Sequence, residues 1–295
     1  MSDNKFKVGS VTIIGRPNVG KSTLLNAIIS DKLSIVSRRP QTTRHQILGV
    51  LNQPGLQIAF YDTPGFQHRF KNKMNIVMNR TVRSRLDNVN VVILLIEALR
   101  WKESDLKELE TLSEGSNVFL VINKVDSVED KSSLLPFIDL IKDNYNFAEI
   151  VPISALRSDG VKLLIDTIGK YLDSGDPIFE IDVNTDRGKE FFVTEFIREQ
   201  LYLFLGDEIP YKSGVVVEDF DESDNIIKIK VAIVVDRKNH KGIVIGNKGG
   251  TLKKIVSSAR LNIEKKFSKK VFLEVWVKVH TGWIDSNANL RDLAS

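Results

Sequence analysis

The fold is decided by the stretch Gly15-Arg16-Pro17-Asn18-Val19-Gly20-Lys21-Ser22. It matches the phosphate-binding loop pattern G-x-x-x-x-G-K-[ST] at every fixed position. Residues 8–14 are mostly β-branched and predict a buried strand, and residues 22–29 carry apolar positions that suit a helix. In this context backbone N–H groups converge on one anion. The sequence therefore predicts a phosphate site in which Lys21 meets the β- and γ-phosphates and Ser22 meets Mg²⁺. The alternative is a glycine-rich turn that fits by chance.

The composition is that of an ordinary globular protein. The chain has 295 residues, of which 42% are apolar and 27% are charged, and this length is enough for two domains. It has no cysteine, which excludes disulfides, thiolate zinc sites and a cysteine nucleophile. Neither an apolar signal region nor a run of membrane-spanning length is present. These features predict a cytoplasmic protein.

Positive charge is concentrated in one stretch of the second half. Residues 237–270 contain eleven basic residues and a single acid, Glu264, which gives this stretch a charge of +10. Because the whole chain carries +4, the remainder sums to −6. Such a block predicts a face that binds a polyanion, and the alternative is a solvated helix surface.

A second motif follows a predicted hairpin. Residues 46–51 and 56–61 read as strands joined by a proline–glycine turn, and the second strand leads into Asp62-Thr63-Pro64-Gly65. An aspartate at this place can hold Mg²⁺, and the Gly65 N–H can reach a γ-phosphate. Alone, D-T-P-G is simply good turn chemistry, but its distance from the phosphate loop favours a nucleotide role.

A third motif predicts the base. Asn123-Lys124-Val125-Asp126 follows an apolar strand at residues 118–122. The Asp126 carboxylate can accept from both the N1–H and the 2-amino group of guanine, whereas adenine offers no such pair of donors. Asn123 can tie this loop to the phosphate loop or contact the base, and the stem of Lys124 can lie along the ring. Further along, Ser154-Ala155-Leu156 can offer backbone N–H groups to the guanine O6.

Strands and helices alternate through the first half. This pattern predicts an α/β fold with a mostly parallel sheet and helices on both faces, and every motif falls at the carboxyl end of a strand. We expect a first domain at residues 1–175, a linker at 176–186 and a second domain at 187–295, because Leu172–Pro177 breaks the last helix.

The second half predicts a single-stranded RNA site. A helix at residues 190–205 and strands at 214–220 and 226–235 precede the turn Gly246-Asn247-Lys248-Gly249, which a basic helix and a strand at 271–279 follow. Such a G-x-x-G turn lets a nucleic-acid backbone approach closely, and the order of elements resembles the second type of KH domain. The alternative is an ordinary glycine boundary between helices. The predicted RNA contacts are Lys241, Ile243, Ile245, Gly246, Asn247, Lys248, Gly249, Gly250, Lys253 and Lys254.

The ordered motifs of both halves resemble the Era family of bacterial GTPases across nearly the whole chain. By this resemblance Thr43, or its neighbour Thr42, closes over the γ-phosphate and Mg²⁺. The resemblance and the motifs imply catalytic roles for Lys21, Thr43 and Gly65, and Mg²⁺ ligands at Ser22, Thr43 and Asp62. The nucleotide site then comprises Gly15, Arg16, Pro17, Asn18, Val19, Gly20, Lys21, Ser22, Thr23, Asp62, Thr63, Pro64, Gly65, Phe66, Asn123, Lys124, Val125, Asp126, Ser154, Ala155 and Leu156.

The same resemblance implies a slow GTPase that binds the 3′ region of small-subunit ribosomal RNA and assists assembly of that subunit. Phe66 stands where Ras-like GTPases have a glutamine that orients water, so we expect an intrinsic turnover on the order of 10⁻⁴–10⁻² s⁻¹. With Asn18 in its phosphate loop, the chain resembles relatives that bind K⁺ beside the phosphates.

Other functions stay open at this stage. They are a GTPase that acts on another RNA or in tRNA modification, a P-loop ATPase or kinase, and a passive RNA-binding protein. We also expect a monomer, and weak attachment of the basic face to anionic membranes.

Overall fold

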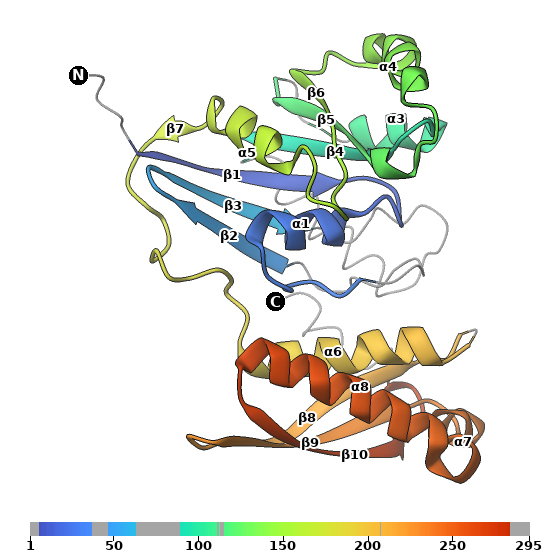
Figure 1. Cartoon of the computed structure of the whole chain (residues 1–295). Coiled ribbons are helices and arrows are strands. Elements are labelled where there is room, and N and C mark those ends of the chain that lie inside the picture. Colours follow the sequence, from blue (N-terminus) through green and yellow to red (C-terminus); the bar gives the residue numbers. More distant parts are fainter. Residues whose placement is uncertain are drawn as a thin grey trace. The chain divides into compact units, whose positions relative to one another are not determined.

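The computed structural model describes residues 6–36, 47–62, 89–110, 112, 115–206 and 208–283. In this part of the chain the backbone forms two compact units. The first consists of the described residues up to Ser34 and from Ile47 to Asp186, and the second consists of Ile35, Val36 and the described residues from Arg187 on. Figure 1 shows the two units, each built around its own sheet.

A seven-stranded sheet forms the centre of the first unit. Its described strands lie in the order β2-β3-β1-β4-β5-β6, and β7 pairs with β1 outside this path. The strands are β1 (Lys7–Ile14), β2 (Ile47–Gln53), β3 (Leu56–Asp62), β4 (Val91–Glu97), β5 (Val118–Asn123), β6 (Glu149–Pro152) and β7 (Asp173–Ser174). From β3 to β6 all neighbours are parallel, whereas β2 and β7 pair antiparallel. The predicted mostly parallel sheet is confirmed.

Helices cover the sheet of the first unit. They are α1 (Lys21–Ile29), α3 (Glu103–Leu109), α4 (Leu134–Ile141) and α5 (Val161–Gly169). Leu109 of α3 and Ile141 of α4 pack into one cluster with Leu94 and Ile122 of the strands. Helix α1 contacts α5, β2 and β3. Strand β4 is buried from Val91 to Ile96 and reads as a continuous apolar run, as expected of a parallel strand covered on both faces.

The sheet register brings the predicted motifs to one edge. Ile13 lies opposite Asp62, so the phosphate loop after β1 starts beside the end of β3. Glu97 at the end of β4 lies opposite Asn123 at the end of β5. The carboxyl ends of four adjacent strands therefore surround one site, which is the usual place for a ligand in such a sheet.

The last residues of the first unit lie along the β2–β3 hairpin. The Gln57 side chain accepts from the backbone N–H groups of Ile178 and Phe179 at 2.7 and 2.9 Å. The N–H of Val50 donates to the Asn184 carbonyl at 2.8 Å. Much of the segment expected to be a linker thus bonds to the first unit.

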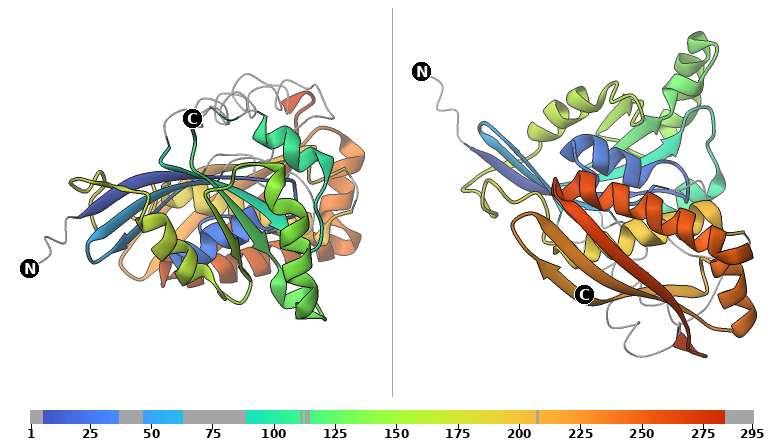
Figure 2. Two further views of the ribbon diagram at one scale, coloured as in Figure 1. Left: turned by 90° about the horizontal axis from the view of Figure 1, so that it is seen from above. Right: turned by 60° about the horizontal axis from the view of Figure 1, so that its bottom comes forward.

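The second unit is a three-stranded sheet with two long helices on one face. Its elements are α6 (Lys189–Phe204), β8 (Ser213–Glu222), β9 (Ile226–Val235), α7 (Lys238–Ile245), α8 (Gly250–Phe267) and β10 (Lys270–Val279). Strand β9 is central, antiparallel to β8 and parallel to β10. Figures 1 and 2 show α6 and α8 side by side over this sheet. The predicted order of helices and strands is confirmed.

Candidate functional site

The phosphate loop joins β1 to α1 in a conformation that needs its glycines. Gly15 has a φ of 141° and Gly20 a φ of 108°, both in the region that side chains disfavour. A Cβ placed on Gly15 would lie 2.3 Å from the Leu95 carbonyl oxygen. A Cβ on Gly20 would lie 2.3 Å from Nδ2 of Asn123. Both glycines therefore allow backbone turns and close packing that an alanine would prevent.

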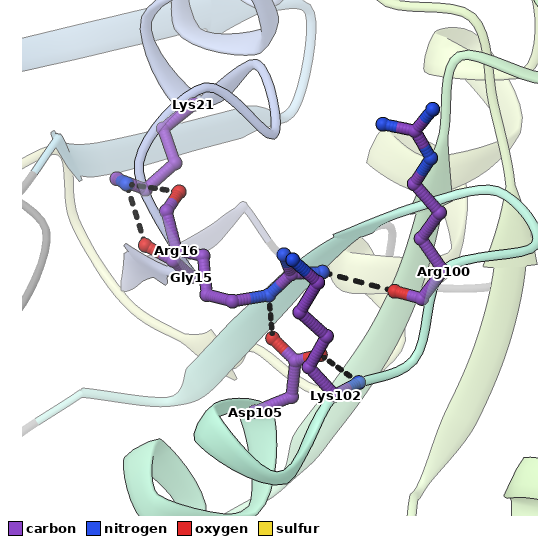
Figure 3. A network of polar contacts seen from close by, with 6 residues as sticks. All are labelled: Gly15, Arg16, Lys21, Arg100, Lys102 and Asp105. Atoms are coloured by element: carbon purple, nitrogen blue, oxygen red, sulfur yellow. Dashed lines mark hydrogen bonds and ion pairs between the residues drawn. The ribbon is translucent and has the colours of Figure 1, made fainter. Parts of the chain in front are cut away.

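Lys21 at the start of α1 is buried under this loop. Its Nζ donates to the carbonyl oxygens of Gly15 at 2.6 Å and Arg16 at 3.1 Å, as Figure 3 shows. Burial lowers the pKa of Lys21 below its ordinary value, and the nearby carboxyl groups of Glu108 and Asp62 oppose this change. The Lys21 ammonium group is held inside the loop, so it can exchange its hydrogen bonds to these carbonyls for hydrogen bonds to a phosphate oxygen.

Asp62 presents an arrangement that fits a magnesium ion. Its Oδ2 accepts from the hydroxyl of Ser22 at 2.9 Å and from that of Ser34 at 3.2 Å. Its Oδ1 is buried without a hydrogen-bond partner in the described part of the chain. Burial raises the pKa of Asp62, while Lys21 and the two hydroxyls lower it. Hydroxyl and carboxylate oxygens are the ligands that Mg²⁺ prefers, and the ion would supply the charge that the buried Oδ1 lacks.

Phosphates would complete such a site. Within the described ranges no three His, Cys, Asp or Glu residues gather as a metal site. Mg²⁺ is commonly held by one or two protein oxygens together with phosphate oxygens and water, so Ser22 and Asp62 are a sufficient protein contribution.

Asn123 ties three loops together at the other end of the site. Its Nδ2 donates to the Val19 carbonyl at 2.8 Å, and its Oδ1 accepts from the Ala155 N–H at 2.9 Å. Of the two roles open from the sequence, the structure thus displays the link to the phosphate loop. The second bond joins the N-K-V-D loop to Ser154-Ala155-Leu156, so the predicted base-binding segments lie together.

Asp126 is oriented by a neighbouring hydroxyl. Its Oδ1 accepts from the Ser154 hydroxyl at 2.6 Å, and its Oδ2 lies 4.0 Å from Nε of Arg157. Ser154 is fully buried, so this hydroxyl is a fixed donor. A carboxylate held in this way can present its remaining lone pairs to two donors of a base.

Lys124 has a specific partner that the sequence did not indicate. It adopts a φ of 65°, and its Nζ contacts Oε2 of Glu97 at 3.1 Å. Glu97 also lies 3.1 Å from Arg100. The end of β4 therefore orients the lysine stem that we expect to lie along the base.

Part of the predicted site falls outside the described residues. This holds for Thr42, Thr43, Thr63, Pro64, Gly65 and Phe66. The remaining predicted nucleotide contacts, from Gly15 to Thr23, Asp62, Asn123 to Asp126 and Ser154 to Leu156, surround the carboxyl edge of the sheet. Their contacts with a nucleotide stay predictions.

Sequence reasoning missed two buried acids on α3. Asp105 is fully buried and Glu108 is 2% exposed, although acidic side chains usually lie on the solvent face of an amphipathic helix. Asp105 accepts from Nε of Arg16, as Figure 3 shows. Their spacing with the buried Leu109 places all three on one helix face. That spacing is the signal that could have identified them.

The predicted RNA-binding turn lies between α7 and α8. Gly246 has a φ of 72° and a ψ of −179°, a combination that is nearly restricted to glycine, and a Cβ there would lie 2.2 Å from Oγ1 of Thr251. Gly249 also has a positive φ, and a Cβ on Gly249 or Gly250 would meet nothing within 4 Å. A polymer backbone can therefore approach this side of the turn closely.

Basic and apolar side chains surround this turn. Asn247, Lys248, Lys253 and Lys254 are exposed, and Ile243 is 49% exposed beside the buried Val244. Lys241 and Ile245 are partly buried. The predicted contacts thus form one surface at the beginning of α8 in which charges can meet phosphates and Ile243 can meet bases.

Comparisons with known proteins agree with both halves. The 50S ribosome-binding GTPase family matches residues 10–124, and the KH domain family matches residues 208–284. The chain is 43% identical to the GTPase Era of Nitrosomonas eutropha over 293 residues, which is 99% of each chain. It is 45% identical to the GTPase Era of Stenotrophomonas maltophilia over 284 residues, covering 96% of this chain and 95% of that protein.

Solved structures of Era have the same fold. One is a variant of Era from Aquifex aeolicus bound to GDP and AlF₄⁻, with a TM-score of 0.92 and 37% identity. It covers 97% of this chain and 98% of its own. Another has the same TM-score, identity and coverage and contains Era with MgGDPNP and nucleotides 1506–1542 of 16S ribosomal RNA. The identity over the whole length and the two matched domains show that this chain belongs to the Era family of GTPases.

Proposed function

We propose that this protein binds GTP with Mg²⁺ across the carboxyl edge of the first sheet and hydrolyses it slowly, and that nucleotide state controls RNA binding by the KH domain. The RNA is the 3′ region of small-subunit ribosomal RNA, and the role is assistance in assembly of that subunit. The contact network of Asn123 supports the proposed nucleotide site most directly, because its bonds to Val19 and Ala155 keep the phosphate and base loops in one site. The Era structure that contains both MgGDPNP and 16S ribosomal RNA supports the choice of RNA.

Hydrolysis adds water to the γ-phosphorus and breaks its bond to the β–γ bridging oxygen, giving GDP and phosphate. Lys21 and the loop N–H groups stabilise the negative charge that develops on the phosphate oxygens. Mg²⁺, held by Ser22 and Asp62, supplies further positive charge when bound. Phe66 cannot hydrogen-bond to the attacking water, so turnover stays on the order of 10⁻⁴–10⁻² s⁻¹. Turnover of tens per second by the purified protein alone would contradict this expectation.

The KH surface supports a single-stranded RNA ligand. Lys248 and Lys253 are exposed beside the open side of Gly249 and Gly250, so phosphates can reach both charges and backbone N–H groups. Each phosphate contact adds about −0.7 to the slope of log affinity against log salt for a single strand.

The deciding experiment measures RNA affinity in different nucleotide states. A fluorescent RNA with the 3′ sequence of 16S ribosomal RNA is titrated with the full chain, in GDP and in a non-hydrolysable GTP analogue, against a scrambled RNA of equal length. We expect tighter binding in the triphosphate state and a preference for the 3′ sequence. Equal affinity in both states would refute the coupling, and equal affinity for both RNAs would refute the assigned RNA.

Substitution of the two lysines tests the RNA surface. Lys248→Ala with Lys253→Ala removes two exposed charges, so the salt slope should become shallower by about 1.4 and GTP hydrolysis without RNA should not change. Lys228→Ala, an exposed lysine on β9, is the matched control. Unchanged affinity and slope in the double variant would place the RNA elsewhere.

Finer expectations belong to the same proposal. Asn18 has a φ of 68° within the loop and is the residue expected beside a K⁺ ion, so hydrolysis should be faster in KCl than in NaCl. In the described part of the chain no helix is both long and apolar enough to span a membrane. A monomer, a cytoplasmic location and weak contact of the basic face with anionic membranes stay predictions.

A further inference from the structure

The phosphate loop is attached to α3 through one arginine. Nε of Arg16 donates to Oδ1 of Asp105 at 2.6 Å, and its NH2 group donates to the Arg100 carbonyl at 2.9 Å. The other carboxylate oxygen of Asp105 accepts from the Lys102 N–H at 2.9 Å. Figure 3 shows this network running from the loop to the beginning of α3. The guanidinium group is thus fixed at two points on the segment that follows β4.

The burial of this pair makes the attachment strong. The side chain of Asp105 is fully buried and that of Arg16 is 15% exposed. Charge-assisted hydrogen bonds in such surroundings are about twice as strong as neutral ones, and the geometry of a guanidinium fixes direction as well as distance. Loss of either partner would leave the other charge buried and unpaired.

A second acid extends the contact by one helical turn. Glu108 lies near Lys21 and hydrogen-bonds to the backbone of Gly15. The residues at both ends of this loop, Gly15 and Lys21, therefore face α3. Helix α3 therefore contacts the phosphate loop through both Asp105 and Glu108.

An external support helps to order this loop, because its glycines leave it many alternative conformations. Gly15, Asn18 and Gly20 all have positive φ values. Glycine loses more conformational freedom on ordering than other residues, so the arrangement of N–H groups around a phosphate is entropically costly. An ion pair from within the loop to a packed helix restricts these alternatives before a nucleotide arrives.

We propose that Asp105 is a positioning residue for the GTPase reaction, which holds the phosphate loop through Arg16 in the shape that receives the phosphates. It does not touch the nucleotide itself. A misplacement of about 1 Å in a catalytic site can reduce rates about 100-fold, which sets the scale of the expected effect.

The test is a double-mutant cycle on nucleotide affinity. Asp105→Asn keeps the size of the side chain and an acceptor for the Lys102 N–H, whereas Arg16→Gln removes the guanidinium. Each should weaken the affinity for fluorescent GDP about 10- to 100-fold, and the double variant should be no weaker than the worse single variant. The affinity for a GTP analogue should fall in parallel, because both nucleotides share the β-phosphate.

Two further measurements separate positioning from general stability. The ratio of GDP to xanthosine diphosphate affinities should change much less than the affinities themselves, because Asp126, which distinguishes the bases, is oriented by Ser154 and not by Arg16. The value of kcat should fall at saturating GTP, since the loop N–H groups also stabilise the transition state. Glu103→Gln is the control, because Glu103 lies exposed on the same helix, 3.2 Å from Lys107.

Several outcomes would overturn the proposal. GDP affinity and kcat within twofold of the unchanged protein, with only a lower melting temperature, would mean that Asp105 merely stabilises α3. Additive losses in the double variant would mean that Arg16 and Asp105 act separately. If Asp105→Asn does not fold, Arg16→Gln tests the same contact from its less buried partner. Unchanged GDP affinity of the Arg16→Gln variant would equally overturn the proposal.

Discussion

Glu108 should make the first unit less stable as pH rises through neutrality. Its side chain is 2% exposed, and burial raises the pKa of this carboxyl to about 7 from 4.5, although Lys21 opposes the shift. Between these two values the folded state keeps a proton that the unfolded state releases. The free energy of unfolding therefore falls as pH rises from about 4.5 to 7 and is fully reduced above that.

The magnitude follows from the two pKa values. Their difference, about 7 minus 4.5, corresponds to about 3 kcal/mol at roughly 1.4 kcal/mol per pKa unit. Glu108→Gln resembles the protonated form and keeps an acceptor for the Gly15 N–H. Because the Glu108 carboxylate also supports the charge of Lys21, part of the gain is lost on substitution. We expect the variant to be more stable by about 1–3 kcal/mol at pH 8 and by less than about 1 kcal/mol at pH 5.

Hydrogen exchange can follow the first unit alone. Urea-dependent exchange of peptides from the buried strand β4, in the nucleotide-free full chain, gives its free energy of unfolding at pH 5 and pH 8. Glu103→Gln on the exposed side of α3 is the control, and it should show the same difference between the two pH values as the unchanged protein because it keeps Glu108. A Glu108→Gln variant that differs from the unchanged protein equally at both pH values would refute the reasoning.

Two other substitutions test the nucleotide site. Asp126→Asn removes the carboxylate expected to accept from the guanine donors. Competition against fluorescent GDP should therefore show about 10²- to 10⁴-fold weaker GDP binding and a relative gain for xanthosine diphosphate. An unchanged preference between the two nucleotides would contradict the assignment of Asp126 to the base. Gly20→Ala places a Cβ 2.3 Å from Nδ2 of Asn123 at a φ of 108°, so calorimetry should show GDP affinity lowered at least about tenfold and the melting temperature lowered. Gly169→Ala at the end of α5, where a Cβ meets only Leu56 at 3.9 Å, is its control, and equal effects of both would exclude the strain argument.

Much of the fold could be predicted because local signals and tertiary structure agree. The strand at residues 226–235 was predicted with the bounds that β9 has, since its alternation and β-branched residues suit a sheet covered on one face. The proline–glycine turn at residues 54–55 indicated the β2–β3 hairpin for a similar reason. The phosphate, base and G-x-x-G motifs are short patterns with fixed spacing, so sequence reasoning can identify them without knowledge of the distant contacts that complete their geometry.

The remaining features depend on contacts between distant residues. Helix α3 spans Glu103–Leu109, and its acids Asp105 and Glu108 turn inward because Arg16 and Lys21 lie there. Ser34 reaches Asp62 because Asn26 fixes the backbone of Ser34, with bonds of 2.7 and 2.9 Å. The pairing of β7 with β1 joins residues more than 160 positions apart. Because β7 is only two residues long, its sequence shows no strand pattern that could have predicted it.

The edge of the first sheet carries a mechanical consequence. Strand β2 is the edge strand of the described strand order. Its Val50 N–H donates to the Asn184 carbonyl, and its Asn52 side chain donates to the Val183 carbonyl. These bonds hold the segment that directly precedes the second unit. In sequence, β2 begins four positions after Thr43, which with Thr42 is expected to respond to the γ-phosphate. If the residues around Thr43 respond to the γ-phosphate as expected, β2 would carry that response directly to Val183 and Asn184, which lead into the second unit.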